Sequence, residues 1–316
     1  MLYKAYSAYL QEKYGAKVYK LPINLPVTCP NRDGTLGREG CAFCGPIGTG
    51  YESLPSSMSV REQITQNKAY IAQKYKAKKF IPYFQNFSNT YLPLPQLAAY
   101  LEEAVTATSD IAALAIATRA DCLNDAHLAL LEEIRNKYSV DITVELGLQT
   151  VNYHSLAKIN RAHTLAEFID AVFRLKRNYP AMRVCAQMIL NLPWDNLQDS
   201  IEGAKILSAL QVDEVKLHAL YVVKNTLLAK WYETGAVSLR TKEDYIENVI
   251  AFLEHLRPET VIGRLIGRAP AADTLFANWQ SGWWKIQAEI EEKMRLMDTW
   301  QGKKCDYLNG RAVRHF

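Results

Sequence analysis

The sequence predicts an α/β protein built on a parallel sheet, because short apolar segments alternate along the chain with segments of helical periodicity. Segments such as residues 97–105 repeat apolar residues every three or four positions, as amphipathic helices do. Two capping-box patterns, Ser59-x-x-Glu62 and Thr164-x-x-Glu167, mark expected helix starts. The candidate strands between the helices are residues 17–25, 80–87, 112–118, 142–148, 182–190 and 214–220.

Two architectures fit this alternation, an open doubly wound sheet and a full or partial barrel. Polar residues follow several candidate strands, at residues 88–90, 118–119 and 149–150. In both architectures ligands bind at the carboxyl ends of the strands, so these residues are candidates for a binding site. Each of them taken alone is equally typical of a turn or a helix cap.

The pattern changes after residue 220. We expect residues 1–220 to form the strand–helix unit and residues 221–316 to form an extension that packs against it. Within the extension, Thr241-x-x-Asp244 predicts a helix start, and a short apolar run follows at residues 260–266. The tail is rich in tryptophan, which is more typical of a core or a lid than of a ligand-stacking surface.

The composition is that of a globular protein with a sizeable core. Of 316 residues, 49% are hydrophobic and 22% are charged. The balance of 37 basic against 33 acidic residues neither favours nor excludes nucleic acid as a partner. No apolar stretch approaches the length of about 18 residues that a membrane span needs, and the N-terminus lacks a signal-peptide pattern. We therefore expect a cytoplasmic protein with no membrane partner, whose cysteines stay reduced.

Three cysteines share one glycine-rich loop, where Cys29, Cys41 and Cys44 have the spacing C-x11-C-x2-C. A structural zinc site has four protein ligands, whereas three thiolates leave one position open for chemistry. Iron–sulfur clusters are also held by cysteine thiolates, and three on a four-iron cluster leave one iron free. A zinc site completed by Asp33 or a distant histidine is the alternative. The other cysteines are isolated, as small buried apolar residues often are.

The loop, with Phe43 just before its last cysteine, resembles the cluster-binding motif of radical S-adenosylmethionine (radical SAM) enzymes. Its long first gap is similar to that in the radical SAM subunit of Elongator, and the resemblance to the YhcC/YtqA-like radical SAM proteins is closer still. The matching stretches occur in the same order, at residues 24–34, 83–91, 118–122, 145–150, 159–163 and 216–218.

This resemblance implies a partial (β/α)6 TIM-like radical SAM barrel with an α/β C-terminal extension. It also implies a 4Fe-4S cluster on Cys29, Cys41 and Cys44, with S-adenosylmethionine bound to the free iron. In such enzymes the reduced cluster cleaves S-adenosylmethionine to a 5′-deoxyadenosyl radical, which abstracts hydrogen from a substrate. The Elongator relationship suggests a tRNA nucleoside as substrate, and flavodoxin or ferredoxin is the kind of electron donor expected.

The same resemblance implies further contacts with the cofactor. Residues 88–90 would hold the methionyl amine, Glu145 the ribose or amino group, and Arg161 the methionyl carboxylate. Glu145 could instead be a structural ion-pair partner, and Arg161 could merely cap a helix. The full set of cofactor-binding candidates is Phe43, Ser88, Asn89, Thr90, Glu145, Gln149, Arg161 and Asn191.

Arg119 and Lys216 are the candidate catalytic residues, placed by the resemblance at the mouth of the barrel, where they would meet an anionic group. An ion-paired structural role is an equal alternative for both. This chain also departs from its relatives, because Gln187 and Asn191 stand where a histidine and a glycine are usual. Alanine at 162 replaces a usual glycine. These changes predict a divergent substrate pocket around an intact cluster loop.

Two non-catalytic alternatives remain at the level of the sequence. One is a nucleic-acid-binding protein with a zinc or iron–sulfur site. The other is an electron-transfer iron–sulfur protein, although an iron open to exogenous ligands makes a poor relay. The ordered motifs outside the cysteine loop favour the enzyme over both.

Overall fold

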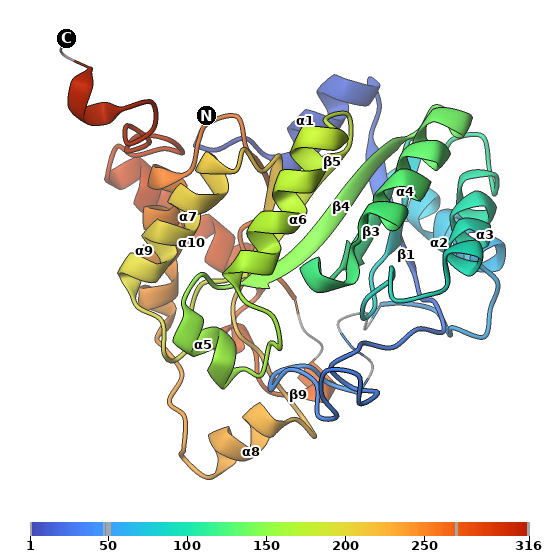
Figure 1. The fold of residues 1–316 in the computed structure, drawn as a ribbon. Coiled ribbons are helices and arrows are strands. Elements are labelled where there is room, and N and C mark those ends of the chain that lie inside the picture. Colours follow the sequence, from blue (N-terminus) through green and yellow to red (C-terminus); the bar gives the residue numbers. More distant parts are fainter. Residues whose placement is uncertain (1, 47, 49–51, 269–270, 315–316) are drawn as a thin grey trace.

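The computed structural model describes residues 2–46, 48, 52–268 and 271–314, and its centre is one curved parallel sheet (Figure 1). Seven strands follow one another in the order β1-β2-β3-β4-β5-β6-β8, with β1 and β8 at the two edges. The curved sheet forms a half-barrel, open between these two edges. Its strands are β1 (Val18–Ile23), β2 (Lys79–Phe84), β3 (Ala113–Thr118), β4 (Asp141–Gln149), β5 (Arg183–Ile189), β6 (Glu214–His218) and β8 (Val261–Arg264).

This topology confirms the predicted partial barrel. A doubly wound sheet would reverse its strand order partway, whereas here the spatial order follows the chain. The six predicted strands are all present, with ends that differ by a few residues. The seventh strand, β8, comes from the apolar run at residues 260–266, so the segment after residue 220 contributes to the same sheet. The run is too short to show a strand period in the sequence.

Helices cover the convex face of the sheet (Figure 1). The predicted capping boxes at Ser59 and Thr164 are confirmed and begin α2 and α6, and the predicted helix start at Thr241 is confirmed as the start of α9. The helices that link successive strands are α2 (Val60–Tyr75), α3 (Leu94–Val105), α4 (Asp125–Tyr138), α6 (Leu165–Asn178), α7 (Leu197–Ala209) and α9 (Lys242–His255).

The remaining elements lie outside the seven-stranded sheet and the helices that link its strands. They are α1 (Tyr6–Tyr14), α5 (Tyr153–Lys158), α8 (Leu227–Glu233), α10 (Trp283–Leu296), the antiparallel pair β7 (Val222–Val223) and β9 (Thr274–Phe276), and the 3-10 turns η1 (Ala120–Cys122), η2 (Ala271–Asp273), η3 (Asn278–Gln280) and η4 (Arg311–Val313). Among the described residues, no helix is both long and apolar enough to cross a membrane.

The two faces of the sheet carry different side chains. On β4, Leu146 and Leu148 belong to the large core between sheet and helices. On the concave face, Ala113, Ala115 and Ala117 of β3 pack in a smaller cluster with Leu10 of α1. Because side chains alternate along a strand, Glu145 faces the barrel interior together with the alanines. The small side chains on β3 leave room there for longer polar ones.

The tryptophan-rich tail is only partly in the core. Trp279 packs against the main core. Trp283, Trp284 and Trp300 are 39%, 59% and 45% exposed, so these three are not in the core, and a lid role for them stays a prediction. Trp283 and Trp284 lie in the first turn of α10, whose buried residues are Ile286, Ile290 and Met294.

Candidate functional site

The cysteine loop follows β1 and lies at the same end of the half-barrel as α5 and α8 (Figure 1). Cys29, Cys41 and Cys44 are free thiols, and all three line one cavity of about 90 Å³. The carboxyl end of the parallel strands is where barrel enzymes bind their ligands. The loop therefore brings its thiols to the end of the barrel at which chemistry is expected.

The spacing of these thiols argues against a single zinc ion. Two sulfurs bound to one zinc at about 2.3 Å each cannot lie more than about 4.6 Å apart. Among the described residues, the group whose three ligand atoms all lie within 4.8 Å of one another is Glu145, Cys185 and Glu214, and not the loop cysteines. A wider thiol triangle suits a polynuclear cluster, and thiolates are the ligands that such clusters take.

The loop is fastened to the residues that follow α5. The side-chain amide of Asn31 donates to the backbone oxygen of Asn160 over 2.7 Å, and the amide of Asn160 donates to the backbone oxygen of Gly40 over 2.8 Å. The Ala42 backbone N–H donates to the Ile159 oxygen over 2.9 Å. Asn31 is fully buried, so these bonds are shielded from water.

Most of the predicted site residues line the cavity of the cysteines. Residues from strands β3, β4 and β5 and from the loops between strands and helices meet there although they lie far apart in the sequence. Besides the three cysteines, the cavity is lined by Phe43, Ser88, Arg119, Glu145, Gln149 and Arg161. A neighbouring cavity of about 270 Å³ shares Phe43, Cys44 and Gln149 with the first, and Ile189, His218, Leu220 and Arg264 form part of its wall.

Four predicted residues are not among those that line either cavity. Asn89 donates to the backbone oxygens of residues 84, 86 and 117, and Thr90 lies 2.6 Å from the Thr118 hydroxyl. Asn191 accepts the backbone N–H of Leu220 over 2.7 Å. These three side chains form hydrogen bonds at the strand ends and do not line either cavity. For Asn89, Thr90 and Asn191 a direct cofactor contact stays a prediction.

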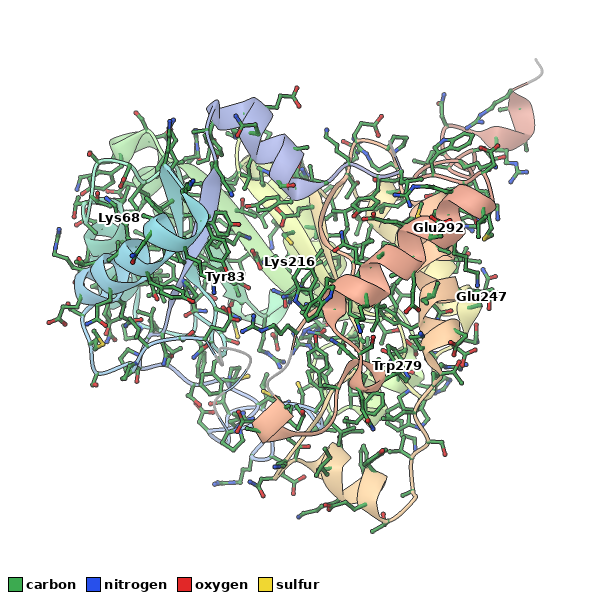
Figure 2. The ribbon with its side chains drawn as sticks, turned by 180° about the vertical axis from the view of Figure 1, so that it is seen from behind. Lys68, Tyr83, Lys216, Glu247, Trp279 and Glu292 are labelled. Atoms are coloured by element: carbon green, nitrogen blue, oxygen red, sulfur yellow. The ribbon has the colours of Figure 1, made fainter. Side chains whose placement is uncertain are left out.

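Lys216, the fourth, belongs to a buried polar network in the barrel interior. Its Nζ lies 2.6 Å and 2.5 Å from the two carboxylate oxygens of Glu145, and Lys20 Nζ lies 2.6 Å from the same carboxylate. Lys216 also lies over the ring of Tyr83, with 4.3 Å between Nζ and the ring centroid (Figure 2). Lys216 therefore has the ion-paired role that the sequence left open, and its contact with a substrate stays a prediction.

Glu145 is held as a carboxylate by its two lysines. Burial alone would raise its pKa, but the ammonium groups of Lys20 and Lys216 lower the pKa below its ordinary value. Lys20 Nζ is also 4.0 Å from Glu214, so a cation already lies between the two carboxylates. The two carboxylates of the compact group formed by Glu145, Cys185 and Glu214 thus already have a lysine within ion-pair distance.

Arg161 is the buried cation nearest to the cysteines that has no acidic partner. Its Nη1 lies 3.5 Å from the Cys41 sulfur, and its Nη2 donates to the Gly147 backbone oxygen over 2.5 Å. Its Nε has no hydrogen-bond partner, and no carboxylate among the described residues lies within ion-pair distance. Glycine at 147 lets the guanidinium lie against the strand, because a β-carbon would lie 2.9 Å from Arg161 Nη2 and that side chain would have to shift. A buried guanidinium without a counter-ion favours an anionic ligand.

Arg119 differs because its charge is compensated. It forms two parallel bonds with Asp121, of 2.8 Å and 2.7 Å, and its third nitrogen lies 3.9 Å from the Cys29 sulfur. Burial would lower the pKa of Arg119, but Asp121 raises it above its ordinary value. Arg119 is thus ion-paired, and its role as a mouth residue for an anionic substrate stays a prediction.

Several residues of the site were not predicted from the sequence. Asn31, Lys20 and Asp121 are the main ones. Asn31 stands inside the cysteine loop, and Lys20 is a lone charge within an apolar strand segment, so both carried a local signal. Their partners, however, lie more than one hundred residues away along the chain. A pairing of this kind follows from the curvature of the sheet and not from any local pattern.

Comparisons with known proteins identify the class. The family profile of the radical SAM superfamily matches residues 24–205, and that of the radical SAM C-terminal domain matches residues 212–295. The chain therefore belongs to the radical SAM superfamily of enzymes. It is 33% identical over 301 residues to the uncharacterized protein YtqA of Bacillus subtilis (strain 168), a match that covers 95% of this chain and 92% of YtqA.

A second relative is protein YhcC of Escherichia coli (strain K12), 31% identical over 282 residues that cover 89% of each chain. Among solved structures, the chain is similar to the archaeal Elp3 of Methanocaldococcus infernus, with a TM-score of 0.69 at 14% identity. That match covers 90% of this chain and 64% of the Elp3 chain. Methylornithine synthase (PylB) matches with a TM-score of 0.52 at 11% identity, over 94% of this chain and 87% of that one. These two likenesses concern the fold.

Ala162 has a left-handed backbone, with φ of +60°, a conformation that costs alanine more than glycine. We expect Ala162→Gly to raise the free energy of unfolding by about 1 kcal/mol, because glycine adopts this conformation without strain. The matched control is Ala157→Gly, an exposed position within α5, which should lower the free energy of unfolding by a similar amount. Urea denaturation measures both, and a destabilised Ala162→Gly variant would contradict the assigned strain.

His163 predicts a pH dependence of stability. Burial, aided by Arg161, lowers its pKa from 6.5 to about 3, so the folded protein keeps the ring neutral. As the pH falls below 6.5, the unfolded chain takes up this proton first, and the folded state loses stability. Between about pH 7.5 and pH 5.5 the wild type should lose about 1.4 kcal/mol more than His163→Asn. Equal losses in urea titrations of the two proteins would show that His163 titrates normally.

Proposed function

We propose that Cys29, Cys41 and Cys44 hold a 4Fe-4S cluster and that S-adenosylmethionine binds beside it in the cysteine-lined cavity. The observation that carries this proposal is the convergence of three free thiols and the unpartnered Arg161 on a single cavity. The thiols lack a fourth cysteine partner, so a cluster on them has one iron available to a ligand. Membership of the radical SAM superfamily supports the same assignment.

Different side chains around the cavity are suited to different groups of the cofactor. Arg161 is suited to the methionyl carboxylate, because its guanidinium is buried and has no acidic partner. The hydroxyl of Ser88 is buried without a hydrogen-bond partner and lines the same cavity, so it can bond the methionyl amine. Both contacts hold the methionyl group at the side of the cavity where the cysteines lie.

The adenine is expected in the neighbouring cavity. Phe43, Ile189 and Leu220 provide apolar walls there, and Phe43 borders both cavities. Asn191 accepts the Leu220 backbone N–H, so it keeps this wall in position, and its direct contact with the cofactor stays a prediction. Gln149 and Gln187 add neutral amides between the two cavities. The arrangement is that of a mostly apolar pocket with a few polar groups that orient the ligand.

When bound, the reduced cluster supplies the electron that cleaves S-adenosylmethionine to methionine and a 5′-deoxyadenosyl radical, which removes hydrogen from a substrate. The protein keeps water away from the site, since Cys41, Arg119, Glu145 and Arg161 are all buried. His218 stays neutral in the second cavity, because burial and then Arg264 lower its pKa well below the ordinary value.

Reconstitution with iron and sulfide under anaerobic conditions tests the proposal. We expect the wild type to take up about four irons per chain and to form 5′-deoxyadenosine when dithionite is added. Cys41→Ser should lose both properties, because the cluster loses one of three thiolates. Cys305→Ser is the matched control, since Cys305 lies outside the cavity, and it should behave as the wild type. One tightly bound zinc with no cleavage product would favour the non-catalytic alternative instead.

For the substrate we propose a tRNA nucleoside, which the resemblance to the Elongator subunit suggests. Arg264 in the second cavity supports an anionic substrate, because no carboxylate among the described residues pairs with it. A deletion strain should then lack one modified nucleoside, or accumulate its precursor, when total tRNA is digested and analysed by mass spectrometry. Identical nucleoside profiles in deletion and parent strains would rule out tRNA.

A further inference from the structure

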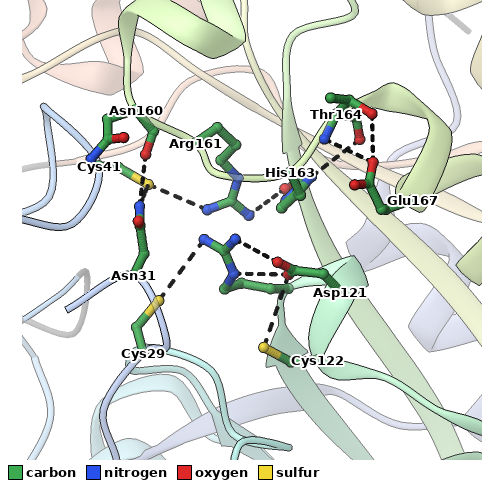
Figure 3. Close-up of polar contacts among 12 residues, drawn as sticks. Cys29, Asn31, Cys41, Asp121, Cys122, Asn160, Arg161, His163, Thr164 and Glu167 are labelled. Carbon is green, nitrogen blue, oxygen red and sulfur yellow. Dashed lines mark hydrogen bonds and ion pairs between the residues drawn. The ribbon is translucent and has the colours of Figure 1, made fainter. Parts of the chain in front are cut away.

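Each loop cysteine has an arginine beside it, and the three arginines reach different atoms. Arg119 lies 3.9 Å from the Cys29 sulfur and Arg161 lies 3.5 Å from the Cys41 sulfur. Arg32 instead donates to the backbone oxygen of Cys44 over 2.5 Å. Figure 3 shows Arg161 directed at Cys41, on the opposite side of the site from Cys29. Two of the three sulfurs thus receive an N–H from a guanidinium.

The two arginines that lie beside sulfurs differ in whether an acidic side chain neutralises their charge. Arg119 is neutralised by a bidentate pair with Asp121, whose side chain also lies 3.9 Å from the Cys122 sulfur (Figure 3). Arg161 has a neutral backbone oxygen and a sulfur as its partners, and no acidic side chain within the described part of the chain. No carboxylate of the described residues therefore neutralises its positive charge, which acts on the nearby thiols. Asn31 adds a neutral amide 3.9 Å from the Cys41 sulfur.

Hydrogen bonds to the sulfurs, together with charge and solvent exposure, set the reduction potential of an iron–sulfur cluster. Adding one electron makes the cluster more negative, so a nearby cation stabilises the reduced form more than the oxidised form. The effect is strong where water is excluded, and Arg161 is only 7% exposed. An acidic side chain at the same distance acts in the opposite direction.

We propose that Arg161 raises the reduction potential of the cluster and that Asp121 lowers it by neutralising Arg119. The inference rests on the proposed function, because it presupposes a cluster on the three cysteines. Arg161 and Asp121 act through the cysteine ligands and are positioning residues in this role. The opposite signs expected for the two residues distinguish an electrostatic effect from general damage to the site, which would not raise the potential in one variant and lower it in the other.

The experiment is a redox titration of the reconstituted protein, followed by electron paramagnetic resonance without S-adenosylmethionine. At the potential where the wild-type cluster is half reduced, Arg161→Met should lower the ratio of reduced to oxidised cluster at least tenfold, which is about 59 mV for one electron. Arg161→Lys keeps the charge and should lower the ratio less. Asp121→Asn should raise the ratio several-fold. The control is Arg177→Met, which removes an exposed arginine from the last turn of α6.

A ratio within twofold of the wild type for Arg161→Met overturns the proposal, as does an Asp121→Asn variant whose ratio does not rise. If Arg161→Met does not fold, Arg161→Gln, which also removes the charge, and Asp121→Asn give the same decision. A wild-type protein that forms no four-iron cluster overturns the proposed function, and this inference with it. A cluster that forms but keeps the same potential in every variant overturns the inference alone.

Discussion

The site depends on the pair of asparagine amides that join the cysteine loop to the turn after α5. Asn31 and Asn160 bond to each other's loops, and the Ala42–Ile159 backbone bond lies beside them. This junction places Cys41 next to Arg161, and thereby sets both the shape and the charge of the cavity. Loops that carry ligands need such support, because a loop without buried hydrogen bonds has little stability of its own.

The barrel interior supplies a second constraint. Lys20, Glu145 and Lys216 come from β1, β4 and β6, so the bonds of one carboxylate to two lysines join three strands of the half-barrel. The edge strand β1 is thereby tied to β4, at the centre of the open sheet, and through it to β6. The alanines of β3 are small enough to admit this network, and helix α1 packs against the same face. The interior is thus polar at its centre, and the cysteines lie at the carboxyl end of the strands.

The sequence predicted the parts of this structure that have a local signal. The strand–helix alternation, the capping boxes and the cysteine loop each depend on residues close together in the chain. The contacts of Asn191 and Lys216 were harder to predict from the sequence. Which neighbours a strand side chain meets depends on irregularities of the sheet, such as the register shift after Gly147. Strand β8 was missed as part of the sheet because it spans only Val261–Arg264 and follows a helix that reads as a separate unit.

The central claim is that three cysteines leave one iron of a four-iron cluster open to S-adenosylmethionine. Mössbauer spectroscopy of protein reconstituted with iron-57 tests it most directly, because it resolves irons with different ligands. On addition of S-adenosylmethionine, the account predicts that one iron in about four acquires a distinct signal while the others keep theirs. Four equivalent irons that do not respond to S-adenosylmethionine, or a protein that binds no cluster, would contradict it.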